Sequence, residues 1–313
     1  MHTFIRVVEI WTPSESGEFL EFNSGYYGPL EEFKRTSMKE TFAYGEGLPG
    51  NAWKQARPVV LKEFDDTTFL RTESAHEVGL TSAIAIPVFS GNTLKAVILF
   101  LCGDTNELSG AIEVWCDDGL SGLALIDGYY GDLERFEWLS KRIKFPRGRG
   151  LPGKVWETVQ PMIMGDLANS NSFLRSKAAA DKGITTSIAI PINSNENIED
   201  IGSVVTFLSS KSTPIAKRFE IWTADAEGNS LQFAAGIIQD SEEVEAANPK
   251  RCIQKGKGVI GETLQSGIPV MSSKLTADSL PEITNGNVDE YTSLLAIPIY
   301  YQDNLNSIVA FYN

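Results

Sequence analysis

The chain is poor in the residue types from which many enzymes build a reactive centre. It has 313 residues but only two histidines, His2 and His76, and three cysteines. Ser-His-Asp and Cys-His arrangements therefore lack a credible histidine partner, and no His/Cys group has metal-ligand spacing. We predict no catalytic residue and no metal site, and the sequence identifies no cofactor.

Disulfides and long apolar runs are also missing. The cysteines Cys102, Cys116 and Cys252 are too scattered for a disulfide scaffold and form no C-x-x-C pair. The longest apolar run, residues 96–102, is far shorter than the roughly 18 residues that a membrane span needs. The first residues lack the basic and apolar segments of a signal peptide. We therefore expect a cytoplasmic protein with no membrane association.

Positive charge is scarce. The chain carries 27 Lys and Arg against 41 Asp and Glu, a net charge of −14. A phosphate backbone would be repelled unless one face gathered the basic side chains, so no nucleic-acid partner is predicted. The basic segment 141–149 is interpreted as the solvated flank of a turn, with the holding of a small anion as the alternative. The 42% hydrophobic fraction is typical of a globular protein.

The chain contains one unit three times. Glu-Ile/Val-Trp, a glycine-rich turn and Ala-Ile-Pro recur in the same order, and the tryptophans of the first motif are 104 and 107 residues apart. This period is the length of an ordinary domain, so we predict three copies with separate cores. The copies are residues 1–107, 108–212 and 213–313, and the glycine-rich turns are residues 45–53, 148–156 and 256–264.

Hydrophobic periodicity predicts the same elements in each copy. In copy 1, alternation predicts strands at residues 4–11 and 19–22, and residues 30–39 form a helix or an irregular cover. The glycine turn leads into a short helix at 51–55, and Gly79 ends a second helix at 69–78. Further strands are expected at 59–61, 83–89 and 94–101. Short turns join neighbouring strands, so the fold class is α+β, with helices on an antiparallel sheet.

The motifs G-x-G-L-P-G-x-x-W, F-L-R-x-x-x-A-x-x-x-G-[LI] and A-I-P-[VI] make each copy resemble the GAF domain, a sensory module of bacterial signalling proteins. The resemblance implies three tandem profilin-like domains, each with an antiparallel sheet of five or six strands. It also implies a pocket between one sheet face and the connecting segments. Copy 3 is divergent, because Ile260 replaces the proline and Leu264 the tryptophan. Whether copy 3 keeps any binding role is left open.

The glycine motif could be mistaken for a phosphate loop, but it lacks the lysine and the serine or threonine of a Walker motif. We interpret it as a structural turn that enters a helix. The cyclic-nucleotide signature of phosphodiesterase GAF domains is absent, and no cysteine lies where a covalent bilin would attach.

Two arginines are the strongest candidates for ligand binding, because each follows an aromatic residue before a helix in the two better-preserved copies. A guanidinium there could bind a carboxylate or phosphate with two hydrogen bonds. The alternative is an internal salt bridge, for example to Glu63 in copy 1 and to Asp166 in copy 2, which lie at the end of the preceding strand. Tryptophans after the glycine turns are either core or ligand platform. The candidate pocket residues are Trp53, Glu63, Phe69 and Arg71 in copy 1, and Trp156, Asp166, Phe173 and Arg175 in copy 2.

These observations predict a non-enzymatic sensory or regulatory protein. Its first two copies would bind a small anionic or aromatic metabolite, and it would signal through contact with a partner protein. A ligand-free scaffold for protein interaction is the main alternative, and a thiol-based redox enzyme or sensor is a weaker one. The oligomeric state is not predicted.

Overall fold

The computed structural model describes residues 4–65, 68–103, 110–194, 201–238, 243–280 and 290–313. Each third of the chain forms one antiparallel sheet with short helices, so the predicted α+β class is confirmed. The predicted boundary between copies 1 and 2 falls outside the described residues.

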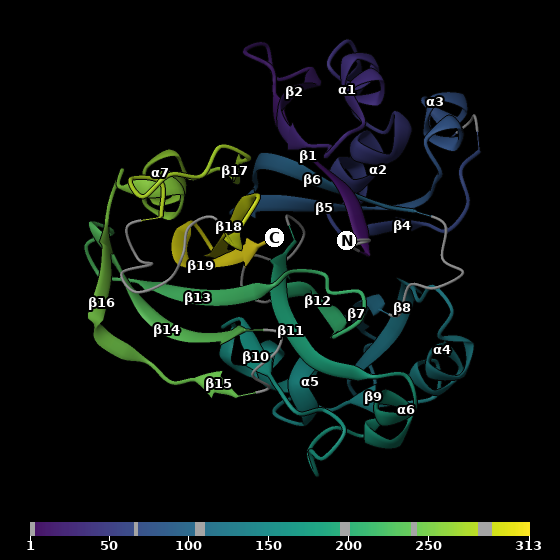
Figure 1. Cartoon of the computed structure of the whole chain (residues 1–313), viewed down its shortest axis with the longest axis vertical. Coiled ribbons are helices and arrows are strands. Elements are labelled where there is room, and N and C mark those ends of the chain that lie inside the picture. Colours follow the sequence, from purple (N-terminus) through teal and green to yellow (C-terminus); the bar gives the residue numbers. More distant parts are fainter. Residues whose placement is uncertain (1–3, 66–67, 104–109, 195–200, 239–242, 281–289) are drawn as a thin grey trace.

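Copy 1 is a six-stranded sheet of order β3-β2-β1-β6-β5-β4, with helices on its outer face (Figure 1). The predicted strands and helices are present, and a short edge strand, β3, was not expected. The elements are β1 (Ile5–Pro13), β2 (Phe19–Tyr26), α1 (Glu31–Ser37), β3 (Thr41–Ala43), α2 (Gly47–Gln55), β4 (Val59–Leu61), α3 (Thr72–Glu77), β5 (Leu80–Ser90) and β6 (Thr93–Gly103).

Copy 2 repeats this order strand for strand, as β9-β8-β7-β12-β11-β10. Its elements are β7 (Gly110–Asp117), β8 (Leu123–Tyr129), α4 (Glu134–Ser140), β9 (Lys144–Phe145), α5 (Gly150–Thr158), β10 (Met162–Met164), α6 (Ser176–Asp181), β11 (Ile184–Asn193) and β12 (Ile201–Ser210).

Copy 3 keeps the central strands but differs after its second strand, where β14 pairs with two strands, the short β15 and the longer β16, which takes the place of β3. Its sheet order is β15-β14-β13-β19-β18-β17. Its elements are β13 (Arg218–Ala224), β14 (Ser230–Ile238), β15 (Val244–Glu245), β16 (Asn248–Gln254), α7 (Gly258–Ser266), β17 (Val270–Ser272), β18 (Leu294–Tyr301) and β19 (Asn304–Tyr312).

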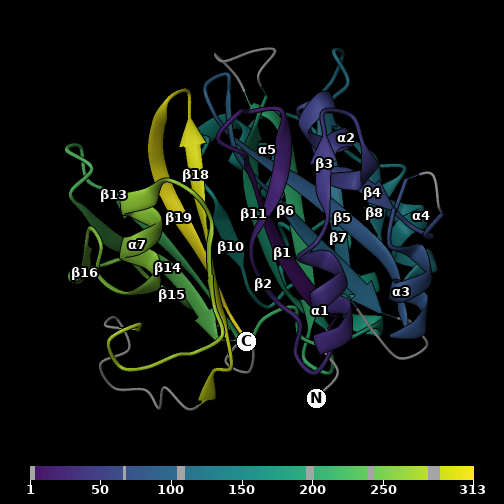
Figure 2. The ribbon, with the colours of Figure 1, turned by 90° about the horizontal axis from the view of Figure 1, so that it is seen from above.

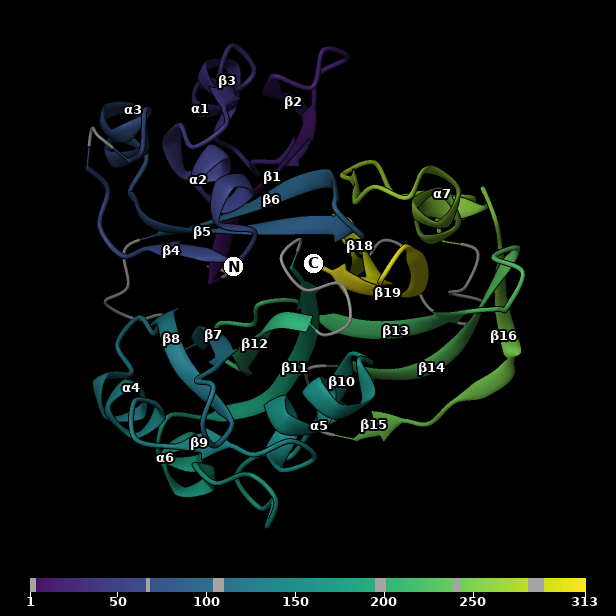
Figure 3. The same cartoon turned by 180° about the vertical axis from the view of Figure 1, so that it is seen from behind.

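The three sheets stand around a common centre, with their helices at the periphery (Figures 1 and 3). The Ala-Ile-Pro strands β5, β11 and β18 contact one another at this centre. The edge strand of each copy contacts the second strand of the next: β4 contacts β8, β10 contacts β14, and β17 contacts β2. These head-to-tail contacts close into a ring, as in a cyclic trimer, but within one chain.

The prediction of three separate cores is wrong, because the inner faces of all three sheets share one hydrophobic cluster. It joins Ile84, Ile188 and Leu295 from the three copies and continues to three equivalent phenylalanines. The rings of Phe100 and Phe207 lie 5.5 Å apart, and those of Phe207 and Phe311 lie 5.3 Å apart. The buried residues of each further cluster under the helices come from a single copy. Each sheet is thus covered on both faces, by the shared cluster on the inner face and by these clusters on the outer face. Figure 2 shows the same arrangement of strands and helices from above.

The glycine motif is the structural turn that the sequence indicated. Gly47 begins helix α2 at a φ of 57°, which favours glycine. A Cβ on Gly50 would lie 2.2 Å from the carbonyl oxygen of Ala43. The corresponding glycines of copies 2 and 3 meet the same constraints. The motif therefore fixes how this helix enters the sheet, and its spacing follows from backbone geometry.

Candidate functional site

A buried carboxylate on the first strand of each copy organises a polar cluster between the sheet and its covering segments. In copy 1, β1 places Glu9 on the helix-covered face, with no exposed surface. Glu9 accepts hydrogen bonds from the indole of Trp11 (3.0 Å) and the hydroxyls of Tyr27 (2.9 Å) and Ser37 (2.9 Å). Arg71, which precedes α3, completes this Glu9 cluster.

Arg71 binds Glu9 with both ends of its guanidinium group. The Nη1–Oε1 distance is 2.6 Å and the Nη2–Oε2 distance is 2.9 Å. Its guanidinium carbon also lies 5.1 to 5.6 Å from the ring centroids of Trp11, Phe33 and Phe69. Only 3% of Arg71 is exposed. The aromatic rings and the carboxylate together occupy the surroundings of this cation.

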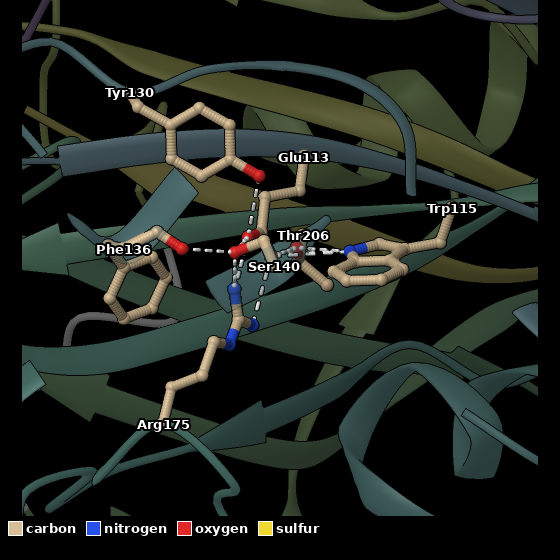
Figure 4. A network of polar contacts seen from close by, with 7 residues as sticks. All are labelled: Glu113, Trp115, Tyr130, Phe136, Ser140, Arg175 and Thr206. Carbon is tan, nitrogen blue, oxygen red and sulfur yellow. Dashed lines mark hydrogen bonds and ion pairs between the residues drawn. The ribbon is translucent and has the colours of Figure 1, made fainter. Parts of the chain in front are cut away.

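Copy 2 has the same arrangement around Glu113, drawn in Figure 4. The carboxylate accepts hydrogen bonds from Trp115 (3.2 Å), Tyr130 (3.0 Å) and Ser140 (2.8 Å), and Arg175 binds both of its oxygens. One addition is Thr206 on β12, whose hydroxyl donates to Glu113 over 2.8 Å. These residues form the Glu113 cluster.

Copy 3 retains the carboxylate but takes its cations from other elements. Glu220 binds Arg218 of β13 (Nε–Oε1 2.7 Å) and Arg251 of β16 (Nη2–Oε1 2.8 Å). The indole of Trp222 and the hydroxyl of Tyr312 donate to its second oxygen over 3.0 and 2.7 Å. These residues form the Glu220 cluster. Copy 3 therefore lost the arginine of copies 1 and 2 and kept a buried ion pair at the same place.

Burial and these carboxylates shape the titration of the groups around them. Burial, and then the negative charge of Glu9, raises the pKa of Tyr27 well above its usual value. Burial and Glu113 do the same to the pKa of Tyr130. Burial by itself lowers the pKa of Arg218, but the charges of Glu220 and Glu245 outweigh it and raise that pKa. The tyrosines therefore stay neutral donors, and the arginine stays charged.

The structure corrects the predicted salt-bridge partners. Arg71 and Arg175 do form internal ion pairs, but with Glu9 and Glu113 on the first strand, not with Glu63 and Asp166. Glu63 is exposed. Asp166 adopts a φ of 47° and accepts a hydrogen bond from the side chain of Asn169 (2.8 Å).

The aromatic candidates divide into two groups. Phe69 and Phe173 each lie 5.1 Å from the guanidinium carbon of their arginine, so those pairs are brought together. Trp53 packs edge-to-face on Tyr44 instead, with centroids 5.2 Å apart. The ring of Trp156 lies under the guanidinium of Arg147, and Trp156 belongs to another hydrophobic cluster than Phe173. The two tryptophans that follow the glycine turns thus belong to the packing of their helices.

Sequence reasoning missed the central residue, the glutamate. Its signal was present, because Glu9, Glu113 and Glu220 each stand between apolar residues in a strand, two positions before a tryptophan. A charged side chain that recurs inside an apolar strand is buried with a partner more readily than it is exposed.

The remaining reactive side chains lie outside these clusters. The cysteines are free. Cys102 is buried in the shared core, and burial raises the pKa of the Cys116 thiol to about 11. Within the described residues, no group of three or more His, Cys, Asp or Glu side chains could hold a metal ion. In the same part of the chain, no helix has the length and apolar character to cross a membrane.

No family model and no curated protein matches the chain, but solved structures do. A free methionine-R-sulfoxide reductase of Neisseria meningitidis matches with 17% identity over 31% of this chain and 52% of its own, with a TM-score of 0.25. The nlh2 GAF domain of A. aeolicus matches with 19% identity over 32% of this chain and 57% of its own, TM-score 0.25.

An NreA protein of Staphylococcus aureus, mutated in its nitrate-binding site, matches with 18% identity over 35% of this chain and 79% of its own, TM-score 0.27. The share of this chain that each structure covers is about one copy. The chain matches only a little over half the length of the first two structures. The GAF domain named from the sequence motifs is thus found again among the matched structures.

Proposed function

We propose that this chain is a non-enzymatic regulatory protein that acts through contact with a partner protein, and that the interiors of its copies are not ligand sites. The observation that carries this proposal is the buried ion pair. In each copy, the space between the sheet and its cover holds a carboxylate, its cation and their hydrogen-bond donors. The chain's own side chains occupy the place where the GAF resemblance implies a ligand.

The arginines are unsuited to capture an external anion. A clamp needs a guanidinium edge that faces the ligand, whereas Nη1 and Nη2 of Arg71 are bound to Glu9. Binding an anion there would require separating a buried pair and leaving Glu9 without its cation, which costs about 3–5 kcal/mol in comparable pairs. A small anion offers no better partner than the carboxylate already in place.

The same groups give little support to catalysis. The tyrosines near the ion pairs have raised pKa values and stay protonated. His76 is exposed and stacks on Phe64, with centroids 6.0 Å apart, and no carboxylate or thiol is shown to bond to it in the described part of the chain. A thiol with a pKa near 11, such as that of Cys116, is a poor nucleophile at neutral pH. These features disfavour the redox alternative.

Exposed apolar side chains support action through protein contact. On copy 2, Trp138 of α4 is 54% exposed and Leu174, just before α6, is 65% exposed. Helices α4 and α6 contact each other, so these side chains come from adjacent elements of one outer face. An exposed tryptophan is a residue type enriched in protein interfaces.

Native mass spectrometry of the full chain purified from its own host tests the proposal. We expect the chain together with a partner polypeptide, and loss of that partner in a Trp138→Ser/Leu174→Ser variant. Tyr44→Ser, at a 57% exposed site on copy 1, is the matched control and should leave the complex intact. A bound metabolite that Arg71→Lys or Arg175→Lys releases would overturn the proposal.

Chemical rescue tests whether the interiors are filled as described. Arg71→Ala should leave a hole of guanidinium shape beside Glu9, so low concentrations of guanidinium should raise the melting temperature of this variant. Ammonium at equal ionic strength is the control, and wild type should gain nothing from either ion. If guanidinium does not stabilise Arg71→Ala, the ion pair does not hold the cluster together.

A further inference from the structure

A cavity of about 260 Å³ lies between copies 1 and 3, on the side of the sheets that faces the shared core. Its walls are mainly apolar, with contributions from both copies. Four polar residues also line it: Tyr26 at the end of β2, Lys217 just before β13, and Thr292 and Asn313 of copy 3. The other lining residues include Ile5, Val8, Phe100, Ile215, Leu295 and Phe311.

Because the three copies form a ring, each contact between copies has a position equivalent to this cavity. We compare it first with the position between copies 1 and 2. Tyr26 pairs with Val8, and Tyr129 occupies the same register opposite Ile112. There, Phe4 of copy 1 packs on Tyr129 with centroids 5.5 Å apart, and both residues are buried. The residue that corresponds to Phe4 in copy 3 is Ile215, five positions before Glu220 as Phe4 is before Glu9.

The smaller Ile215 side chain explains why space remains beside Tyr26. Tyr26 is only partly buried, whereas Tyr129 is 8% exposed. Between copies 2 and 3 the corresponding position is Ile237, which is fully buried. The residues described at these three related sites therefore differ, and the cavity of about 260 Å³ lies at the one between copies 3 and 1.

The chemistry of the lining selects the ligand class. Lys217 donates one N–H to the carbonyl oxygen of Glu290 (2.6 Å), and an ammonium group has two more. The hydroxyl of Tyr26 forms no hydrogen bond within the described part of the chain. A cation and a hydroxyl beside apolar walls fit a molecule with an apolar body and an anionic head. The volume is at the small end of ligand pockets, which start at about 300 Å³.

We propose that the cavity between copies 1 and 3 binds a small carboxylic acid with an aromatic or branched apolar body. The carboxylate takes the free donors of Lys217 and Tyr26, and the apolar body lies against Phe100, Leu295 and Phe311. The site is separate from the three ion-pair clusters. A ligand bound there would therefore affect a partner protein through the contact between copies 1 and 3.

Titration of the full chain with phenylacetate tests this site, with phenylacetamide as a neutral probe of the same shape. Calorimetry gives the affinity, and methyl NMR of the isoleucines locates the probe. We expect shifts of Ile5 and Ile215, and tighter binding of phenylacetate than of the amide. Lys217→Met should weaken phenylacetate binding about five- to tenfold and leave binding of the amide unchanged.

Ile215→Phe reproduces the filling found between copies 1 and 2 and should abolish binding of both probes. If this variant does not fold, Tyr26→Phe provides the second measurement, with an expected weakening of phenylacetate binding, because the carboxylate loses one of its two proposed donors. No methyl shift at saturating phenylacetate, or equal affinity in wild type and Lys217→Met, would overturn the proposal. Shifts confined to Ile184, which packs beside the Glu113 cluster, would overturn it too, and would also contradict the filled interiors proposed above.

Discussion

Replacing the two members of the Glu9–Arg71 pair separately and together measures what holds the cover of copy 1 on its sheet. Arg71→Met leaves a buried carboxylate without its cation, and Glu9→Gln leaves a buried guanidinium without its anion. Removal of one partner of a buried pair costs about 3–5 kcal/mol of unfolding free energy. Each single variant should therefore be destabilised by about that amount.

The double variant Glu9→Gln/Arg71→Met removes both charges together. The glutamine can offer its oxygen to the indole of Trp11, and its NH2 group can donate to the hydroxyls of Tyr27 and Ser37, which accept as well as donate, so these buried groups keep a partner. Its loss should be about 2 kcal/mol, far below the sum of the single losses, because replacing a whole buried pair by neutral side chains is tolerated far better than breaking it.

Urea unfolding followed by tryptophan fluorescence gives these free energies, since Trp11 lies within the cluster. Glu63→Ala is the matched control: this carboxylate is exposed, and its removal should change stability by less than about 0.5 kcal/mol. Additive losses for Glu9 and Arg71, or a loss for Glu63→Ala as large as theirs, would refute the assignment of the ion pair.

Three further outcomes are expected. The pKa values of Tyr27 and Tyr130 are raised in the folded state, so the unfolded chain loses these two protons at a lower pH than the folded chain does. The free energy of unfolding should therefore fall as the pH rises above about 10. In the Tyr27→Phe/Tyr130→Phe variant it should fall less steeply. Excised residues 108–212 should not remain a stable monomer, because the inner face with Ile112, Ile188 and Phe207 loses its cover; sedimentation that shows a folded monomer would contradict the shared core. Gly50→Ala should lower the melting temperature strongly, since its Cβ would meet the carbonyl of Ala43, whereas Lys54→Gly, at an exposed position of the same helix, should cost only about 1 kcal/mol of helix propensity in a thermal scan.

Most of the fold could be predicted from the repeated sequence, because the patterns in it report local structure. Strand alternation, the glycine turn and the hairpin at residues 91–92 depend on neighbours in sequence, and all are present. The shared core depends on contacts between copies, which no local pattern reports. One signal did exist: in β6, residues 96–102 are apolar on both faces, as in a strand covered on both sides.

The candidate site was predicted in part for the same reason. The motif around Phe69 and Arg71 marked a buried guanidinium, since an aromatic side chain and an arginine recur together. Its partner lies 62 residues away on β1, and the nearer Glu63 was the wrong choice. Proximity in sequence is a poor guide here, because the strand order places β1 at the centre of the sheet and β4 at its edge.

Joining the ring into one polypeptide changes what a substitution can do. In a cyclic assembly of three identical chains, every substitution appears at all three interfaces, so a phenylalanine that closes one closes them all. In this chain each interface has its own residues: Phe4 fills one, Ile237 lies at the second, and Ile215 leaves room at the third. The covalent linkage thus allows one interface to specialise while the other two maintain the assembly.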